Sequence, residues 1–215
     1  AFTSVALAND AADSYLNAAD VAVANAVVSA AVGTGYTTRK YVVASWATAC
    51  TSALTYSTTI PNDNNANFTA DGDYRVCVQL SDTAGNTAYG SSTVIHRKVT
   101  VPTATAISLA NDVVDLYLST ADHALTSDLS STATGANYDT LNYTVTLSAT
   151  ACSAAAGWST TIPKTNDASI TADGSTYKVC ARFTDLAQNP AAYVSTANFT
   201  YDNTAPVFTS LALAN

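Results

Sequence analysis

The clearest pattern in the chain is an alternation of apolar and polar residues over Tyr74–Ser81. Every second residue there is apolar, and Cys77 falls among the polar positions. The same alternation returns over Tyr177–Thr184, with Cys180 in the matching place. A period of two predicts a strand with one face in the core and the other towards solvent. An Asp-Gly turn precedes each segment and an Asp-to-Asn turn follows it, so the pattern predicts two equivalent strands.

These two strands belong to a longer internal repeat. Leu7–Asp10 returns as Leu109–Asp112, and Ser57–Pro61 returns as Ser159–Pro163, both 102 residues later. Leu213–Asn215 starts the pattern a third time. We therefore expect two whole units from a tandem array. Repeat 1 is 1–101, repeat 2 is 102–205, and 206–215 is the first strand of a truncated third repeat.

Each repeat contains several short apolar segments separated by turns. In repeat 1 we expect strands at Thr3–Ala8, Val21–Ser29, Lys40–Cys50, Leu54–Thr58, Ala66–Ala70, Tyr74–Ser81 and Ser92–Val101. About seven short strands with frequent turns are typical of a sandwich of two antiparallel sheets. The expected fold class is all-β, with two tandem immunoglobulin-like antiparallel β-sandwich domains. A barrel or an irregular β-repeat is the alternative.

Composition narrows the class of partner. Charged residues make up 11% of the chain, and the formal net charge is −8. All 16 acidic residues are Asp, which is a poor helix former, so we expect few helices. Nucleic acid and anionic membranes attract basic proteins, and no apolar run approaches the roughly 18 residues of a membrane span. We expect no nucleic-acid partner and no membrane insertion of this segment.

The cysteines occur at repeated positions, two in each repeat. An even count at such positions predicts the disulfides Cys50–Cys77 and Cys152–Cys180, and therefore an oxidising compartment. No CxxC spacing indicates a zinc site. Because Cys77 and Cys180 alternate with apolar residues, we expect the bridges on the outer, solvent face of one sheet, between its third and sixth strands. Buried free thiols are the alternative.

Three motifs, in this order, resemble the bacterial immunoglobulin-like tandem repeats of large surface adhesins. They are a Gly-x-Tyr-x-Val segment from Gly72, an Asp-x-Ala-Gly-Asn turn at Asp82–Asn86, and a linker like Asp202–Pro206. Tyr15–Asp20 is also similar to the Ile-Asn-Ala-Ala-Glu segment near the start of many such repeats, with Asp in place of Glu. The resemblance covers both repeats. Gln188 departs from it, because the pattern has Gly there, and the linker Arg97–Pro102 lacks the Asp.

The resemblance implies a non-catalytic stalk or spacer in a bacterial surface adhesin or fibre. We expect an extracellular or bacterial cell-surface location, with neighbouring repeats of the same chain as partners. The first alternative is a binding module that itself recognises a cell-surface glycan or protein. A second alternative is a non-catalytic accessory region of a secreted enzyme.

Few residues are candidates for binding or catalysis. Trp46 falls on the outer face of its strand, and exposed aromatic residues concentrate at binding surfaces. Packing of Trp46 under a neighbouring loop or domain is the alternative. His96 and His123 have no counterpart in the other repeat and stand in no Ser/His/Asp or metal-ligand spacing. We expect no catalytic residues, because a nucleophile needs a base within hydrogen-bond reach.

Calcium is the candidate cofactor that the resemblance implies, since related repeats often bind it near domain junctions. Calcium takes six to eight oxygen ligands. The candidate ligands are Asp10, Asp13, Asp20, Asp112, Asp115, Asp122, Asp82, Asn86, Asp185, Asn189 and Asp202. Lys98 in the first linker opposes a cation there. The alternative is that these aspartates shape turns by accepting hydrogen bonds from backbone amides.

Overall fold

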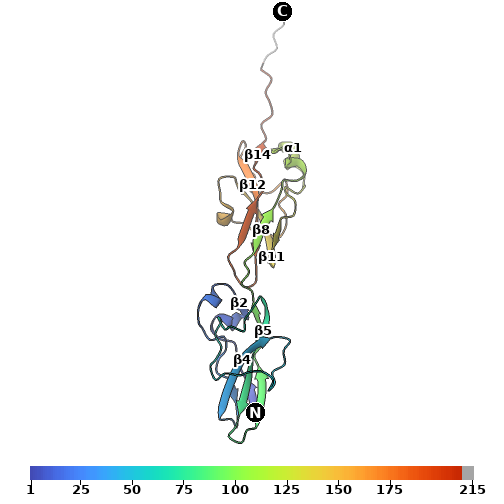
Figure 1. The fold of residues 1–215 in the computed structure, drawn as a ribbon. Helices are drawn as coiled ribbons and strands as arrows, with labels where there is room; N and C mark the ends of the chain where they lie inside the picture. Colours follow the sequence, from blue (N-terminus) through green and yellow to red (C-terminus); the bar gives the residue numbers. More distant parts are fainter. Residues whose placement is uncertain (210–215) are drawn as a thin grey trace, which may run out of the picture. The chain divides into compact units, whose positions relative to one another are not determined.

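The computed structural model describes residues 1–209, and the chain is all-β (Figure 1). It divides into two compact units. Unit 1 comprises Ala1–Val101 and Asp185–Pro190, and unit 2 comprises Pro102–Thr184 and the chain from Ala191 onward. No helix in the described part is long and apolar enough to cross a membrane. Of the expected third-repeat strand, residues 206–209 form no strand, and the rest lies outside the described residues.

The helical segments are all single turns. They are η1 (Asn9–Asp13), η2 (Asp20–Ala22), η3 (Asn111–Val113), α1 (Thr120–His123) and η4 (Cys152–Ala154). The strands of unit 1 are β1 (Phe2–Ser4), β2 (Tyr15–Leu16), β3 (Val32–Gly33), β4 (Thr38–Ser45), β5 (Gly72–Ser81), β6 (Thr87–Ser91) and β7 (Ile95–Arg97). The strands of unit 2 are β8 (Thr103–Ala106), β9 (Tyr117–Ser119), β10 (Thr134–Ala136), β11 (Thr140–Leu147), β12 (Thr176–Thr184), β13 (Ala192–Ser195) and β14 (Phe199–Asp202).

The predicted alternating segment is the central strand of each unit. In unit 1, β4 pairs along one edge of β5, while β6 and then β7 pair along its other edge. β2 completes this five-stranded sheet beside β7, and β1 and β3 form a second, two-stranded sheet. Unit 2 repeats the arrangement around β12, with β11 on one edge and β13 and β14 on the other. Its small sheet is β8 with β10.

Each unit has its own hydrophobic core. The apolar residues of β5, from Tyr74 to Leu80, all belong to the core of unit 1, as their alternation predicts. Val27 and Val28 meet them from the other side of the sandwich. In unit 2 the matching strand contributes Val179 and Phe183 to a separate core. Each repeat can therefore bury its apolar surface without sharing a core with the other.

Three of the expected strands are wrong. Val21–Ser29 begins with the turn η2 and afterwards makes isolated bridges only. The reason is visible in the burial: Val27 and Val28 are adjacent and both are buried, whereas a pleated strand sends neighbours to opposite faces. Ala66–Ala70 is a turn, and Leu54–Thr58 contributes a single bridge to β4.

The expected strand Ser92–Val101 is reduced to β7, and a hydroxyl group marks the break between β6 and β7. The Ser92 Oγ accepts the amide of Val76 at 3.0 Å and donates to the carbonyl of Thr93 at 2.7 Å. The backbone pairing with β5 therefore stops at the end of β6 and resumes at β7. Thr196 does the same in repeat 2, where its Oγ1 accepts the amide of Val179 at 3.1 Å.

The structure also contains a parallel strand pair that the sequence did not predict. β2, near the start of repeat 1, runs parallel to β7 at its end, with Tyr15 opposite His96. The amides of His96 and Lys98 donate to the carbonyls of Ser14 and Leu16, both at 2.8 Å. β9 and β14 form the same parallel pair in repeat 2.

Candidate functional site

Both predicted disulfides are present. The Cα–Cα distance is 5.3 Å for Cys50–Cys77 and 5.6 Å for Cys152–Cys180, and the chain has no free cysteine. Cys77 and Cys180 lie outside the two core clusters. The expectation that they face solvent is wrong, because both are 0% exposed. In repeat 1 the partner Cys50 lies in the loop after β4, and this loop folds over the outer face of β5. Disulfides persist in oxidising environments.

The Asp of each Asp-Gly turn holds the segment that leaves its own repeat. The Asp71 carboxylate accepts the amides of Val99 at 2.8 Å and Thr100 at 3.0 Å. The guanidinium of Arg97 lies 3.4 Å from the same carboxylate. We call this contact the exit clamp of repeat 1. It fixes the direction in which the backbone leaves β7.

Repeat 2 has the same exit clamp. The Asp173 carboxylate accepts the amide of Asn203 at 2.6 Å and the hydroxyl of Thr204. The hydrogen bonds from Thr204 and then Asn203 lower the pKa of Asp173. For Asp71, burial acts to raise the pKa, but the hydrogen bonds from the exit segment and the charge of Arg97 outweigh it and lower the pKa. Sequence reasoning identified Asp71 and Asp173 as turn residues and missed this role. Their recurrence before the central strand was the available signal.

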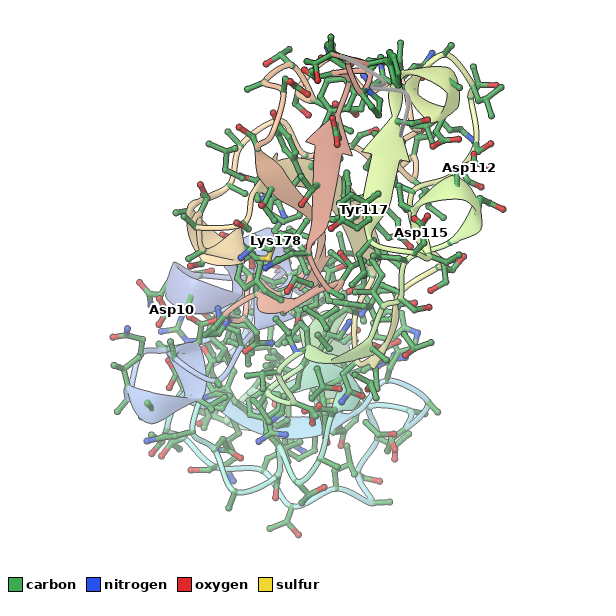
Figure 2. All side chains as sticks on the ribbon, turned by 90° about the horizontal axis from the view of Figure 1, so that it is seen from above. Asp10, Asp112, Asp115, Tyr117 and Lys178 are labelled. Atoms are coloured by element: carbon green, nitrogen blue, oxygen red, sulfur yellow. A yellow bond between two sulfur atoms is a disulfide. The ribbon has the colours of Figure 1, made fainter. Side chains whose placement is uncertain are left out.

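The structure places most of the candidate calcium ligands in turns. Their carboxylates accept hydrogen bonds from nearby groups: Asp13 from Tyr15, Asp115 from Tyr117, Asp20 from Asn17, Asp122 from Ser119, Asp82 from Ala84 and Asn86, Asp185 from Asn189, and Asp202 from Thr204. Asp112 and Asp115 lie on one loop, just before Tyr117 (Figure 2). Among the described residues, no three His, Cys, Asp or Glu side chains gather where they could hold a metal ion. The calcium prediction stays a prediction.

One acidic contact in repeat 1 was not expected. Asp63 is 1% exposed, and its Oδ2 accepts the amide of Asn25 at 3.2 Å. Its Oδ1 is buried with no hydrogen-bond partner. The Asn25 side chain donates to Asp10 at 2.7 Å, so both carboxylates converge on this residue. Burial, followed by the neighbouring Asp10, raises the pKa of Asp63. In repeat 2 the matching position holds the uncharged Thr165.

Trp46 is 40% exposed, but a residue of its own sheet covers it. The Arg75 guanidinium lies 4.0 Å from the centroid of the indole ring, and it also donates to the Trp46 carbonyl. Trp158 in repeat 2 is covered in a related way, by Arg182 at 4.7 Å and by Tyr193. A cation over an indole face is a stabilising contact. The guanidinium therefore occupies one of the two faces of the Trp46 ring.

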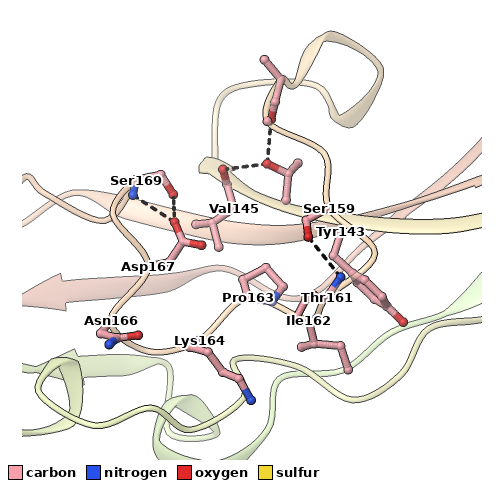
Figure 3. Close-up of a pocket in the computed structure, with 13 residues that line it drawn as sticks. Tyr143, Val145, Ser159, Thr161, Ile162, Pro163, Lys164, Asn166, Asp167 and Ser169 are labelled. Carbon is pink, nitrogen blue, oxygen red and sulfur yellow. Dashed lines mark hydrogen bonds between the residues drawn. The ribbon is translucent and has the colours of Figure 1, made fainter.

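A groove lined by both polar and apolar groups runs beside the edge strand of the large sheet in each repeat. In repeat 2 it has a volume of about 450 Å³, and it lies between Tyr143–Val145 and the loop Thr161–Ser169 (Figure 3). In repeat 1 two hollows lie along the corresponding strand, with volumes of about 190 Å³ and about 450 Å³. The Tyr143 ring is 3% exposed and offers little aromatic surface. The lining of the repeat 2 groove combines apolar residues such as Ile162 and Pro163 with hydroxyl groups, the Lys164 ammonium and the carboxylate of Asp167, which accepts from Ser169.

The two histidines have structural contacts. His96 Nδ1 lies 2.7 Å from Asp73, and its ring packs on Tyr15. The His123 ring packs on Tyr201. Among the described residues, neither histidine is hydrogen-bonded to a hydroxyl or thiol group. A nucleophile paired with a base is therefore not formed around them.

Comparison with known proteins gives distant structural likenesses. No family model matches the chain, and no curated protein matches it. The chain is similar to a solved Ca²⁺-stabilised adhesin with which an Antarctic bacterium binds ice, at 16% identity and a TM-score of 0.43. It is also similar to a 1.5-MDa bacterial ice-binding adhesin, at 14% identity and a TM-score of 0.41, and to Drosophila N-cadherin EC1-4, at 12% identity and a TM-score of 0.26.

These likenesses extend over nearly the whole of this chain. The two adhesin structures match 96% and 94% of it, and the cadherin structure matches 81%. The chain spans 50%, 64% and 43% of the three structures, respectively.

Proposed function

We propose that the chain is a non-catalytic spacer, two immunoglobulin-like repeats of an extracellular stalk that presents a distal binding region. The observation that carries the proposal is the exit clamp, which occurs in both repeats. In each, a carboxylate at the start of the central strand accepts hydrogen bonds from the outgoing backbone. A spacer needs a defined direction of exit from each unit, because a freely jointed linker shortens its reach.

Three further features support this function. Each repeat closes its own core, so units can be added in series. Each is pinned by a disulfide, which fits a location outside the cell or on a bacterial surface. The domain boundaries that fit the exit clamps are those of the sequence repeat, 1–101 and 102–205. The parent protein that we propose is a surface adhesin or fibre.

Measurement of the distance between the repeats tests the proposal. Spin labels placed on one exposed position in each repeat give a distance distribution by electron paramagnetic resonance. Asp71→Ala removes the acceptor for Val99 and Thr100, so we expect the distribution to broaden. Asp173→Ala removes the matching clamp of repeat 2, which lies outside the segment between the labels. It should leave the distribution unchanged and is the control.

Two results would contradict the spacer function. One is a distribution that Asp71→Ala leaves as narrow as in the wild type. The other is a wild-type distribution that is already as broad as that of a flexible linker, because the clamp would then fix no direction.

A second candidate function is recognition of a glycan or protein by repeat 2. The observation that favours it is the groove of about 450 Å³ beside β11, which contains the Asp167 carboxylate. Hydroxyl groups and the Asp167 carboxylate are part of its lining, and they could hydrogen-bond to a sugar. A glycan array probed with the wild type and with Asp167→Ala separates the two functions. Binding that the variant loses supports recognition, and an array without signal supports the spacer.

A further inference from the structure

The first strand of each repeat packs against the strand that directly follows the central strand, and this contact closes the sandwich. β1 hydrogen-bonds to β3 in the small sheet and packs beside β6 of the large sheet. The Phe2 ring packs against the core and lies directly over Gly90 of β6. A Cβ atom added to Gly90 would overlap this ring. We call the space that the first strand of a repeat fills its slot. In the slot of repeat 1, the Phe2 ring leaves room for no residue larger than glycine at position 90.

At the two matching positions of repeat 2 the residue sizes are exchanged. Gly90 lies opposite Val78, the residue after Cys77 on the central strand. In repeat 2 the residue after the cysteine is Ala181, and Val194 lies opposite it. The residue 102 positions after Phe2 is Ala104. Ala104 and Val194 both pack against the core of repeat 2, and β8 packs beside β13. Repeat 1 thus pairs a large residue with a small one, and repeat 2 pairs a small residue with a large one.

We propose that these two residues form a matching pair that determines which first strand each repeat accepts. A Phe-type strand in the slot of repeat 2 would collide with Val194. An Ala-type strand in the slot of repeat 1 would leave a void over Gly90. Both errors destabilise a core. Tandem repeats are prone to exchange of identical elements, so neighbours with opposite pairs keep each first strand in its own repeat.

The same reasoning applies to a segment whose sequence repeats that of the first strand. Val207–Asn215 matches Ala1–Asn9 at seven of nine positions, with Phe208 in the place of Phe2. Val207 and Phe208 are 81% and 78% exposed, so they are not packed on the unit that precedes them. By its sequence, this segment is of the Phe type. It fits a slot of the repeat 1 kind, with glycine at the Gly90 position, and not the slot of repeat 2.

This gives a prediction about sequence. Gly90 lies 88 residues after Phe2, and Val194 lies 90 residues after Ala104. A unit that begins at Val207 should therefore have glycine on the corresponding strand, at about that distance after Phe208. Valine or a larger residue at this position would overturn the matching rule. The inference rests on the repeat organisation and not on the spacer function, so either one can fail without the other.

A double-mutant cycle in the full chain tests the pair itself. Phe2→Ala and Gly90→Val are made singly and together, and unfolding of repeat 1 is followed through Trp46 fluorescence with Trp158 replaced by Phe. Each single variant should lower the urea midpoint, and the double variant should recover more than half of the summed loss. If Gly90→Val alone does not fold, the urea midpoints of Phe2→Ala and of the double variant are compared instead. The double variant should then have the higher midpoint. A double variant whose loss equals or exceeds the sum overturns the proposal.

A second measurement tests the exchange of strands. In Phe2→Ala/Gly90→Val both repeats have slots of the Ala/Val kind, and in Ala104→Phe/Val194→Gly both are of the Phe/Gly kind. After refolding at high protein concentration, light scattering coupled to gel filtration should show a several-fold larger dimer fraction for both double variants than for the wild type. Equal dimer fractions would overturn the claim that the pair prevents exchange.

Discussion

Removal of the disulfide of repeat 1 should destabilise that repeat and leave repeat 2 unchanged. Cys50→Ser with Cys77→Ala opens a loop across 27 residues, which restores about 12 cal/mol/K of entropy to the unfolded chain, or about 3.5 kcal/mol at 25 °C. A unit of this size has a urea slope of roughly 1–1.5 kcal/mol/M. The midpoint for repeat 1 should therefore fall by about 2–3.5 M.

The chain contains a reporter for each repeat, because its two tryptophans are Trp46 in repeat 1 and Trp158 in repeat 2. With Trp158→Phe, fluorescence follows repeat 1, and with Trp46→Phe it follows repeat 2. The matched control opens the Cys152–Cys180 loop, which spans 28 residues and should give a similar loss in repeat 2. A fall in midpoint that is small compared with 2 M would refute the loop-entropy argument. Equal shifts at both tryptophans would refute the conclusion that the repeats have independent cores.

Four further outcomes are expected. Burial raises the pKa of Asp63, so Asp63→Thr, which copies Thr165, should stabilise repeat 1 at pH 7 by about 1 kcal/mol in urea titrations, and the gain should vanish below the ordinary value of 3.8. The pKa of Asp71 is lowered, so the stability from its clamp should persist above pH 3.8 and disappear as the pH falls through the lowered pKa, which the inter-repeat distances would report. Tyr41→Phe leaves the buried amide of Ala31 without an acceptor and should cost about 1–3 kcal/mol in chemical denaturation. Thermal melts in EDTA and in calcium should coincide, since most of the candidate carboxylates already accept hydrogen bonds; a higher midpoint in calcium would establish a site.

Local patterns predicted the centre of each repeat, and contacts between distant segments decided the rest. The alternation around Val76 and Val78 identified the central strand and the face that enters the core. The matching positions of the cysteines identified their pairing. The burial of Cys77 was not predictable, because it depends on how the loop after β4 folds back over the sheet. Val27 and Val28 had the composition of a strand, but the core takes both side chains, which no regular strand allows.

Among the candidate functional residues, too, some roles follow from neighbouring residues in the sequence and others depend on distant contacts. Turn-forming aspartates are recognisable from the residues beside them. The exit clamp joins Asp71 to amides 28 and 29 residues away, and the contact of Asp63 with Asn25 spans 38 residues. Such partners become visible only when the chain is folded. The comparison of Asp63 with Thr165 could have drawn attention to the position, because a buried residue that changes charge between repeats is unusual.

The parallel pairing of β2 with β7 has a mechanical consequence. β2 lies near the beginning of repeat 1 and β7 near its end, so a pull on the two ends of the repeat draws these strands in opposite directions along their length. Tension of this kind shears the hydrogen bonds of His96 and Lys98 together and does not open them one after another. β9 and β14 place the same shear-loaded contact in repeat 2. A repeat connected in this way therefore resists extension best along the axis through its own termini.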